Sequence, residues 1–390
     1  MTQARTSTGS LMAAGFGLTA LAYGLARFAY GLLLPQIKAE LDLGTVAAGW
    51  IGSAAFAAYC AGVVAAFMVV PKLGARAVAV AAGLCATAGL GLAAAAGSAV
   101  FLGGAIALAG ISTGLASPPL AAAVGHHVPK ADRSRANGAI NAGTAAGIVL
   151  SGLAALIFAA AWRELYLGFA AIGAAVTLWL WRAIPDGATG GSAAGHSFRQ
   201  PGLVPLCMAA TLMGAASTAL WTFGADILRE EMAFTDRRIA VAWIVLGATG
   251  LAGVVTGHGT ERFGIPAVHR MSLAMMGVAL LSLTVASWAT FMPFAAMGLF
   301  GAGYIISSGA LLLWGVTLFP DRADLGLGLS FLMVAAGQTA GAPLFALLMN
   351  AAGTSAALAG AALLMACAAI FAPHHALAND PALPHPAGAD

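Results

Sequence analysis

Charge is what this chain has least of, since Asp, Glu, Lys and Arg together make up 8% of its 390 residues. Soluble domains carry about 25% charged residues, so the composition excludes an ordinary water-soluble fold. The mean hydropathy is +0.91 and 61% of the residues are hydrophobic. These values indicate a polytopic membrane protein, most of whose surface faces hydrocarbon.

Motifs of catalysis, nucleotide binding and metal binding are also missing. The sequence has no GxSxG, no GxxxxGK[ST] and no HExxH motif, which argues against a hydrolase, an ATP-driven pump and a zinc protease. Its four cysteines lie in apolar runs without a CxxC pair and are expected as small core residues. A net charge of +3 without a basic block argues against nucleic acid as a partner. We therefore expect neither enzymatic activity nor a cofactor or metal.

Long apolar runs, in contrast, are abundant. About 20 mostly apolar residues suffice to cross the hydrocarbon core. The sequence predicts twelve such segments, at residues 11–34, 46–70, 74–96, 99–123, 136–160, 163–183, 203–226, 238–260, 265–287, 290–317, 326–349 and 354–372. The fold class expected is an all-α membrane protein with twelve transmembrane helices.

The segments fall into two groups of six. Residues 185–202 lie between the sixth and seventh segments, and their Gly, Ser and Pro content is typical of a flexible linker on the cytoplasmic side. The linker divides the chain into six-helix bundles at residues 1–184 and 203–372. Residues 373–390 are rich in Pro, His and Ala and are expected to form a disordered cytoplasmic tail.

The distribution of Lys and Arg predicts the orientation in the membrane, because cytoplasmic loops carry an excess of both. Of the 17 Lys and Arg residues, eleven would lie on the side of the N-terminus and five on the opposite side, while Arg27 lies inside the first segment. Both termini are therefore predicted to be cytoplasmic. The expected location is the cell's inner (plasma) membrane, and the expected state is a monomer.

An internal repeat supports the division into two bundles, as in many transporters built from duplicated halves. Three loci recur at nearly the same offset. The matched residues, with offsets of 190, 194 and 191, are Gly74 and Gly264, Gly143 and Gly337, and Pro129 and Pro320. Together the matches indicate a pseudo-symmetric 6+6 duplication.

The loop after the eighth segment reads Gly257-His-Gly-Thr-Glu261-Arg262-Phe-Gly264. With the repeat, this loop resembles the major facilitator superfamily, whose signature there is Gly-x-x-x-Asp-Arg-x-Gly-Arg-Arg. The resemblance implies secondary transport by alternating access and a gating role for Glu261, Arg262 and Gly264.

The equivalent loop after the second segment departs from the signature at Phe67, Pro71 and Ala75. In the superfamily the acidic and basic positions of this signature hold the cytoplasmic helix ends together in one state of the cycle, and the first copy here lacks the acid. The pair Arg27-Phe28 followed by Leu-Leu-Pro, and Gly49-Trp50 beyond it, resemble the bacterial YbfB-like branch of the superfamily, which does not define a substrate.

Arg27 is the strongest candidate for a functional residue, because a guanidinium inside a membrane segment costs several kcal/mol and usually faces a protein interior. Tyr23, Arg27 and Tyr30 follow at i, i+4 and i+7 and share one helical face. The resemblance implies that helices 1, 4, 7 and 10 line a central cavity, so this face would contact substrate. A guanidinium there can hold a carboxylate or phosphate with two hydrogen bonds. Alternatively, Arg27 pairs with a buried acid or with carbonyl groups and fixes helix packing.

The seventh segment carries a second polar stripe. Thr218, Thr222 and Asp226 follow at intervals of four residues, with Trp221 beside them. Thr218, Trp221 and Thr222 are predicted to contact substrate. Asp226 is predicted to form an outer gate or a proton-linked ion pair with Arg27; the alternative is a solvated acid at a helix end.

Other segments offer further polar side chains. Ser117 in the fourth segment and Tyr304 and Ser308 in the tenth complete the predicted substrate contacts. The amides of Asn137, Asn141 and Gln338 are expected to join neighbouring helices by hydrogen bonds.

These features predict a secondary active transporter that moves a small organic solute through the lipid bilayer, preferentially an organic anion, with protons as the coupling ion. Facilitated diffusion is the alternative to proton coupling. Export of hydrophobic drugs or metabolites is the first alternative, which the aromatic residues Tyr23, Tyr30, Trp221 and Trp314 would also suit. A non-transporting membrane sensor built on a transporter fold is the second.

Overall fold

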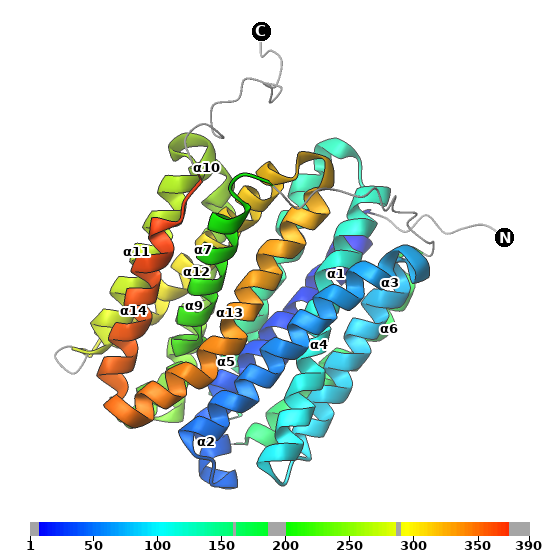
Figure 1. Ribbon diagram of the computed structural model, residues 1–390. Helices are drawn as coiled ribbons and strands as arrows, with labels where there is room; N and C mark the ends of the chain where they lie inside the picture. Colours follow the sequence, from blue (N-terminus) through cyan, green and yellow to red (C-terminus); the bar gives the residue numbers. More distant parts are fainter. Residues whose placement is uncertain (1–7, 159–160, 186–199, 286–289, 374–390) are drawn as a thin grey trace.

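The computed structural model describes residues 8–158, 161–185, 200–285 and 290–373, and all regular structure within these ranges is helical. The predicted tail from residue 374 onward and most of the predicted linker, residues 186–199, lie outside the described residues. The helices stand side by side, with α1–α6 and α7–α14 occupying opposite sides of the molecule (Figure 1).

Among the described residues, the first part of the chain forms five helical stretches that are long and apolar enough to cross a membrane. Their elements are α1 (Thr8–Thr19), the π-helix η1 (Ala20–Phe28), α2 (Ala29–Leu41), α3 (Thr45–Ala94), α4 (Ala99–His127), the 3-10 turn η2 (Lys130–Asp132), α5 (Arg133–Ile157) and α6 (Trp162–Ala183). The first three run on without interruption as one helical stretch, Thr8–Leu41.

The second part repeats this arrangement with more interruptions. Its elements are α7 (Leu203–Trp221), α8 (Gly224–Glu230), α9 (Asp236–Gly250), the 3-10 turn η3 (Leu251–Val255), α10 (Thr256–Phe263), α11 (Ile265–Leu283), α12 (Met292–Leu318), the 3-10 turn η5 (Pro320–Arg322), α13 (Ala323–Ala352) and α14 (Thr354–Ile370).

Two helix ends in this part of the chain carry residues that are typical of such positions. Thr235 caps α9 by accepting a hydrogen bond from the Arg238 amide, and Gly353 turns the chain between α13 and α14 at φ 85°.

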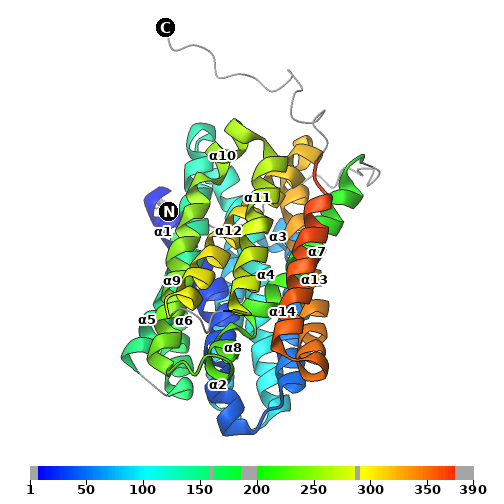
Figure 2. The same ribbon diagram turned by 90° about the vertical axis from the view of Figure 1, so that its left-hand side faces the viewer.

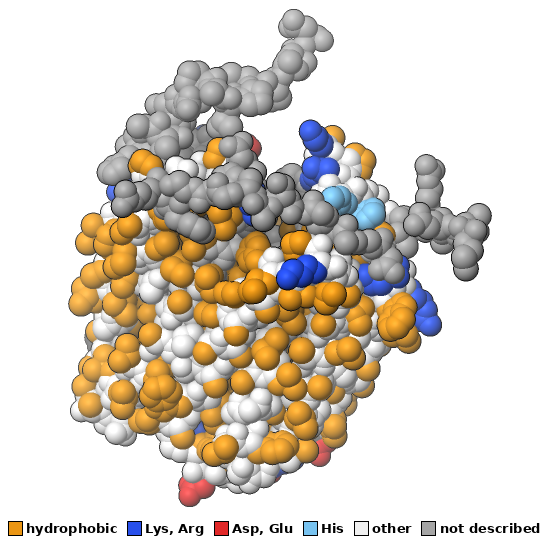
Figure 3. All heavy atoms as spheres, turned by 45° about the vertical axis from the view of Figure 1, so that its right-hand side comes forward, with side chains coloured by type: hydrophobic (Ala, Val, Ile, Leu, Met, Phe, Trp, Pro, Cys, Tyr) orange, Lys and Arg blue, Asp and Glu red, His pale blue; other side chains and the backbone are white. Residues whose placement is uncertain are grey.

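Ten helical stretches among the described residues are long and apolar enough to cross a membrane, and α14 is a shorter apolar helix. The 50-residue α3 covers the second and third predicted segments, and Gly74, at φ 84°, breaks it between them. Apolar side chains cover the side of the molecule, with Lys and Arg near its upper edge and acidic residues near its lower edge on the face in Figure 3. The chain is a multi-pass membrane protein.

Each locus of the predicted sequence repeat has the same local structure in both copies. Gly74 and Gly264 both adopt a positive φ, 84° and 80°, which L residues rarely adopt and which turns the chain into the following helix. The Pro129 and Pro320 loci form the short 3-10 turns η2 and η5 that precede α5 and α13.

The glycine-rich helices repeat the same close packing. A Cβ at Gly143 or Gly147 of α5 would clash with the carbonyl oxygens of Phe16 and Ala20 in the first helical stretch. At the second copy, Gly337 and Gly341 of α13 would clash in the same way with the carbonyl oxygens of Thr211 and Ala215 in α7. Each part of the chain thus binds its first long helix to its fifth by backbone contact.

The two parts of the chain meet along two pairs of helices, α3 with α13 and α5 with α9. Figure 2 shows α2 and α8 side by side at the end opposite α10. Between α3 and α13, Ser53 donates a 2.6 Å hydrogen bond to the Thr339 carbonyl. A Cβ at Gly152 of α5 would lie 3.1 Å from the Ala240 carbonyl oxygen of α9. These contacts bring side chains from both parts into one shared interior.

Two predicted segments differ from the structure in ways that bear on function. The segment expected at residues 203–226 is not one helix, because α7 ends at Trp221 and α8 begins at Gly224. The first segment contains the π-helix η1 and continues through Pro35 to Leu41. Thr113 of α4 donates a 2.9 Å hydrogen bond to the Ala22 carbonyl inside η1. A side chain that takes a helical carbonyl in this way favours the wider π turn.

Candidate functional site

Arg27 lies in η1 at the interior between the two parts of the chain, with 7% of its surface exposed. Its Nη2 donates a hydrogen bond to Oε1 of Gln338 in α13. Four rings surround the guanidinium, whose Cζ is 4.6 Å from the ring centroid of Tyr59, 4.8 Å from Phe28, 5.3 Å from Phe56 and 5.7 Å from Tyr23. Aromatic faces stabilise a desolvated cation by about 2 kcal/mol or more.

The hydrogen-bond network continues from Gln338 into the second part of the chain. The Gln338 Nε2 donates to Oγ of Ser217 in α7 at 3.1 Å and to Oη of Tyr304 in α12 at 3.5 Å. Gln338 and Ser217 are fully buried, and Tyr304 is 5% exposed. Residues Arg27, Gln338, Ser217 and Tyr304 are called the central network below. It joins helices that are distant in sequence and spans both parts of the chain.

The aromatic residues form a continuous wall beside the network. Phe28 stacks on Trp221 with ring centroids 3.9 Å apart, and Trp221 meets Tyr304 edge to face at 4.9 Å. On the other side Tyr23 shares a 2.9 Å hydrogen bond with Ser117 of α4. The predicted residues Tyr23, Arg27, Ser117, Trp221 and Tyr304 are therefore brought together around one interior.

No carboxylate contacts Arg27 among the described residues, where the ion pairs found are Lys38–Asp226, Arg163–Glu40 and Arg229–Asp236. The Arg27 Nε has no hydrogen-bond acceptor within the described ranges, and neither has the buried Trp221 Nε1. A buried charge is ordinarily paired with an opposite charge. Here a neutral amide is the sole hydrogen-bond partner of the guanidinium in the described part of the chain.

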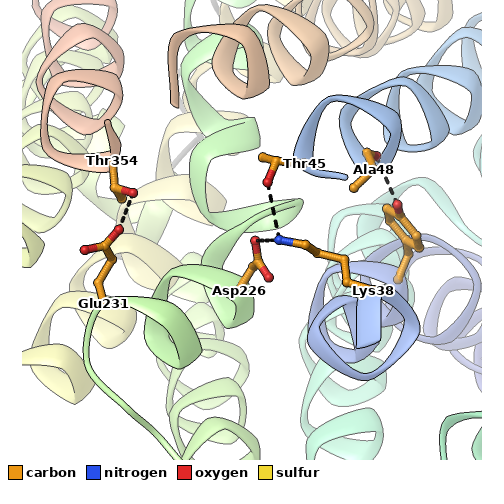
Figure 4. Close-up of polar contacts among 7 residues, drawn as sticks. Lys38, Thr45, Ala48, Asp226, Glu231 and Thr354 are labelled. Atoms are coloured by element: carbon orange, nitrogen blue, oxygen red, sulfur yellow. Dashed lines mark hydrogen bonds and ion pairs between the residues drawn. The ribbon is translucent and has the colours of Figure 1, made fainter. Parts of the chain in front are cut away.

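Asp226 does not pair with Arg27, as the sequence had suggested, but with Lys38. Its Oδ2 accepts a 2.7 Å hydrogen bond from Lys38 Nζ, which also donates to Thr45 Oγ1 at 3.3 Å. Asp226 is 2% exposed and Lys38 is 18% exposed, so the pair is partly desolvated. Figure 4 shows Lys38 between Thr45 and Asp226, where α2 and α8 face each other. This ion pair, the Lys38–Asp226 latch, joins the two parts of the chain at one end of the molecule.

The other predicted substrate residues lie outside the central network. Tyr30 donates a 2.9 Å hydrogen bond to the Ala48 carbonyl of α3, and Thr218 donates to the Ala215 carbonyl within its own helix. Thr222 is buried in the break after α7, where its Cγ2 would lie 3.1 Å from a Cβ at Gly52. Ser308 is half-buried on α12, one turn beyond Tyr304. Tyr30 and Thr218 thus satisfy backbone carbonyls.

The predicted cytoplasmic gating residues lie at the end opposite the Lys38–Asp226 latch. Glu261 and Arg262 are exposed on α10, and Gly264 ends that helix at φ 80°. Figure 1 places α10 at the top of the molecule and α2 at the bottom. The two sets of predicted gating residues therefore belong to opposite ends.

Sequence reasoning missed three residues that the structure assigns to the site. Ser217 belongs to the central network, Tyr59 contributes the ring nearest to the guanidinium, and Lys38 pairs with Asp226. Gln338 was expected to form hydrogen bonds between helices, which it does, but it was not assigned to the site. The sequence gives no signal for Lys38, because its position is that of an ordinary loop cation.

The backbones touch at the latch end, which gives a first testable prediction. A Cβ at Gly31 of α2 would clash with the Trp221 carbonyl oxygen at the end of α7. Gly31→Ala should therefore push α2 away from α7 and destabilise this packed conformation by about 1–3 kcal/mol. We expect faster labelling of Thr222→Cys, in a background without native cysteines, by an impermeant maleimide added from that side. Gly44→Ala is the control, because nothing lies within 4 Å of that position; equal labelling in both variants would contradict the prediction.

Fold and site together define a membrane protein whose buried polar centre is assembled from two packed sets of helices. The profile of the Major Facilitator Superfamily matches residues 16–323. The chain belongs to this superfamily of membrane transporters and is a transporter rather than an enzyme. The finer resemblance to the YbfB-like branch stays a prediction.

The fold is also that of solved transporters of low sequence identity. A crystal structure of the nucleoside transporter NupG (D323A mutant) aligns with a TM-score of 0.77 and 14% identity, covering 92% of this chain and 98% of that one. The E. coli xylose transporter XylE, in a partially occluded inward-open conformation, aligns with a TM-score of 0.76 and 13% identity over 93% and 96% of the two chains. A bacterial homologue of the lysosomal transporter Spinster aligns at 0.69 and 15% identity over 93% and 95%.

One curated relative is similar in sequence. The transcription regulatory protein OpdE of Pseudomonas aeruginosa is 24% identical over 258 residues, which cover 63% of this chain. The match likewise spans 63% of that protein, less than two thirds of its length.

Proposed function

We propose that this protein is a secondary active transporter that carries small organic anions across the inner membrane by alternating access. Twelve spans form two six-helix bundles, residues 1–184 and 203–372, with α3 supplying two spans and α14 the last. The shared local structure of the repeat loci supports this division. The bundles rock about the central network, which lies between them.

The observation that carries the proposal is the buried guanidinium of Arg27, which has no carboxylate partner among the residues that the structure describes. A cation at the interface between two moving bundles is stabilised when an anionic substrate enters, and this favours anions over neutral or cationic solutes. Tyr23, Ser117, Trp221 and Tyr304 surround the position that the anion would take. Tyr30, Thr218, Thr222 and Ser308 shape the path towards it.

The Lys38–Asp226 latch closes the extracytoplasmic end in this proposal. Protonation of Asp226 would remove its charge and weaken the latch, which is how a proton gradient could drive transport. The charged and titratable groups near Asp226 are Lys38 on α2, Arg229 and Glu230 on α8, and Tyr30. Glu261, Arg262 and Gly264 belong to the cytoplasmic gate.

The orientation follows from the excess of Lys and Arg on the side of α10. Both termini, the linker at 185–202 and the tail at 373–390 are then cytoplasmic. The transporting unit is a monomer, because each chain supplies both bundles.

Uptake into proteoliposomes tests the proposal directly. With an inward proton gradient, we expect saturable uptake of radiolabelled carboxylates and little uptake of cationic drugs offered at the same concentration. Asp226→Asn should remove the dependence of uptake on external pH. Uptake of cationic drugs but of no carboxylate would replace the proposal by the drug-export alternative, to which the aromatic wall is also suited.

A membrane sensor is the second candidate, and the similarity to OpdE, a transcription regulatory protein, favours it. A sensor binds its ligand without moving it. We expect ligand binding to purified protein to be accompanied by flux in the same proteoliposomes. Binding without flux, under gradients of either direction, would favour the sensor.

A further inference from the structure

Gln338 occupies the position at which an anionic substrate would meet Arg27. The amide oxygen is the acceptor for the guanidinium, and the amide nitrogen donates to Ser217 and Tyr304. An amide oxygen and a carboxylate oxygen accept hydrogen bonds in similar geometry, but the carboxylate adds a full charge. We propose that Gln338 is an internal stand-in for the substrate's carboxylate, and that the substrates are monocarboxylates with a planar, apolar body. This inference rests on the proposed function and names its substrate class.

The charge count within the site limits the substrate to one carboxylate. Arg27 is the sole cation in the central network, and the cation of the latch, Lys38, is already held by Asp226. A dicarboxylate would bury its second charge without a partner, which costs several kcal/mol. One positive charge without a countercharge therefore matches one negative charge.

The aromatic side chains around Arg27 determine which kind of group the substrate can carry beside its carboxylate. The rings of Tyr23, Phe28, Phe56 and Tyr59 lie within 6 Å of the Arg27 Cζ, and Trp221 extends this wall by stacking on Phe28. Aromatic walls favour flat, apolar groups through stacked and edge-to-face contacts. Two unpartnered donors, Arg27 Nε and Trp221 Nε1, lie in this part of the structure, and a carboxylate has oxygens to spare for such donors.

Replacement of Gln338 by the substrate's carboxylate at Arg27 also links substrate binding to the movement of the two bundles. The Arg27–Gln338 hydrogen bond crosses between η1 and α13, so it must break whenever the two bundles separate at the centre. A carboxylate that takes over Arg27 releases the Gln338 amide to Ser217 and Tyr304, its other partners. Substrate thus replaces an internal contact between the bundles rather than filling an unused space.

Equilibrium binding of benzoate and benzamide to two variants of Gln338 tests the inference. Gln338→Glu places a permanent carboxylate against Arg27 and should weaken benzoate binding at least ~100-fold, as expected for an occupied charge partner. Gln338→Met removes the competing acceptor at similar size and should tighten benzoate binding by ~3- to 10-fold. A residue that merely supported helix packing would weaken binding in both variants. Thermal unfolding and size-exclusion chromatography establish that both variants are folded.

The wild-type protein supplies the remaining comparisons. It should bind benzoate more tightly than benzamide, phthalate or acetate by ~10-fold or more, since these lack the charge, add a second charge or lack the ring. Failure to bind any carboxylate would overturn the proposed function together with this inference. Carboxylate binding that is unchanged in Gln338→Glu, or that favours dicarboxylates, would overturn this inference and leave the transport of anions standing.

Discussion

Replacing Arg27 by alanine is expected to reduce the rate of carboxylate uptake at subsaturating substrate by about 10²- to 10³-fold. The substitution removes the single cation of the central network. Loss of one partner of a buried charged contact costs about 3–5 kcal/mol, and each 1.4 kcal/mol is a factor of ten. Initial rates of uptake into proteoliposomes, at matched protein content, measure the effect.

Two further variants separate charge recognition from helix packing. Arg27→Lys keeps the positive charge but loses the planar fork, so uptake should fall less than in Arg27→Ala while selectivity between carboxylates weakens. Arg237→Ala removes an exposed arginine of α9 and should leave uptake unchanged. If Arg27 merely fixed packing, Arg27→Ala would unfold at lower temperature and yet keep full carboxylate uptake per folded molecule.

Breaking the Lys38–Asp226 latch is expected to open the end of the molecule at which α2 and α8 face each other. Asp226→Asn and Lys38→Met each remove one charge of a pair that is 2% and 18% exposed. Charged contacts of this kind couple by about 0.5–3 kcal/mol. We expect Thr222→Cys, which is buried beside the latch, to react several-fold faster with an impermeant maleimide in either variant, again without the native cysteines.

The charge-swapped double variant, Lys38→Asp with Asp226→Lys, provides the decisive control. It restores the ion pair with reversed polarity, so labelling of Thr222→Cys should return towards the rate of the unaltered latch. Labelling that stays fast in the double variant, or is slow in both single variants, would show that the ion pair does not hold this end closed.

The sequence predicted the all-helical, multi-pass character of the fold well, because long helices depend on local apolar composition. Gly74 and Gly264 are informative even in one sequence, since glycine adopts a positive φ more readily than any other residue. The breaks within helices were not predictable in this way. Within the π-helix η1 the Ala22 carbonyl accepts a hydrogen bond from Thr113 of α4, and no pattern within residues 11–34 reveals that contact.

Only part of the candidate site could be predicted from the sequence, because the remainder depends on contacts between helices that are distant in the chain. Arg27 was found because a charge in an apolar segment is anomalous by itself, and Tyr23 lies close to it on the same helix. Its partner Gln338 is 311 residues away, and the partner of Asp226 is Lys38, 188 residues away. Such pairings depend on how the two parts of the chain pack together, and a one-dimensional spacing argument does not contain that information.

The most direct test of the account is the affinity of the purified wild-type protein for benzoate and for benzamide, measured by isothermal titration calorimetry in one buffer. The two molecules share a ring and nearly a shape, and differ by the negative charge that Arg27 is proposed to recognise. The account predicts that benzoate binds at least ~10-fold more tightly and that Arg27→Ala abolishes this difference. Equal affinities in the wild-type protein, or a preference for benzoate that survives Arg27→Ala, would contradict it.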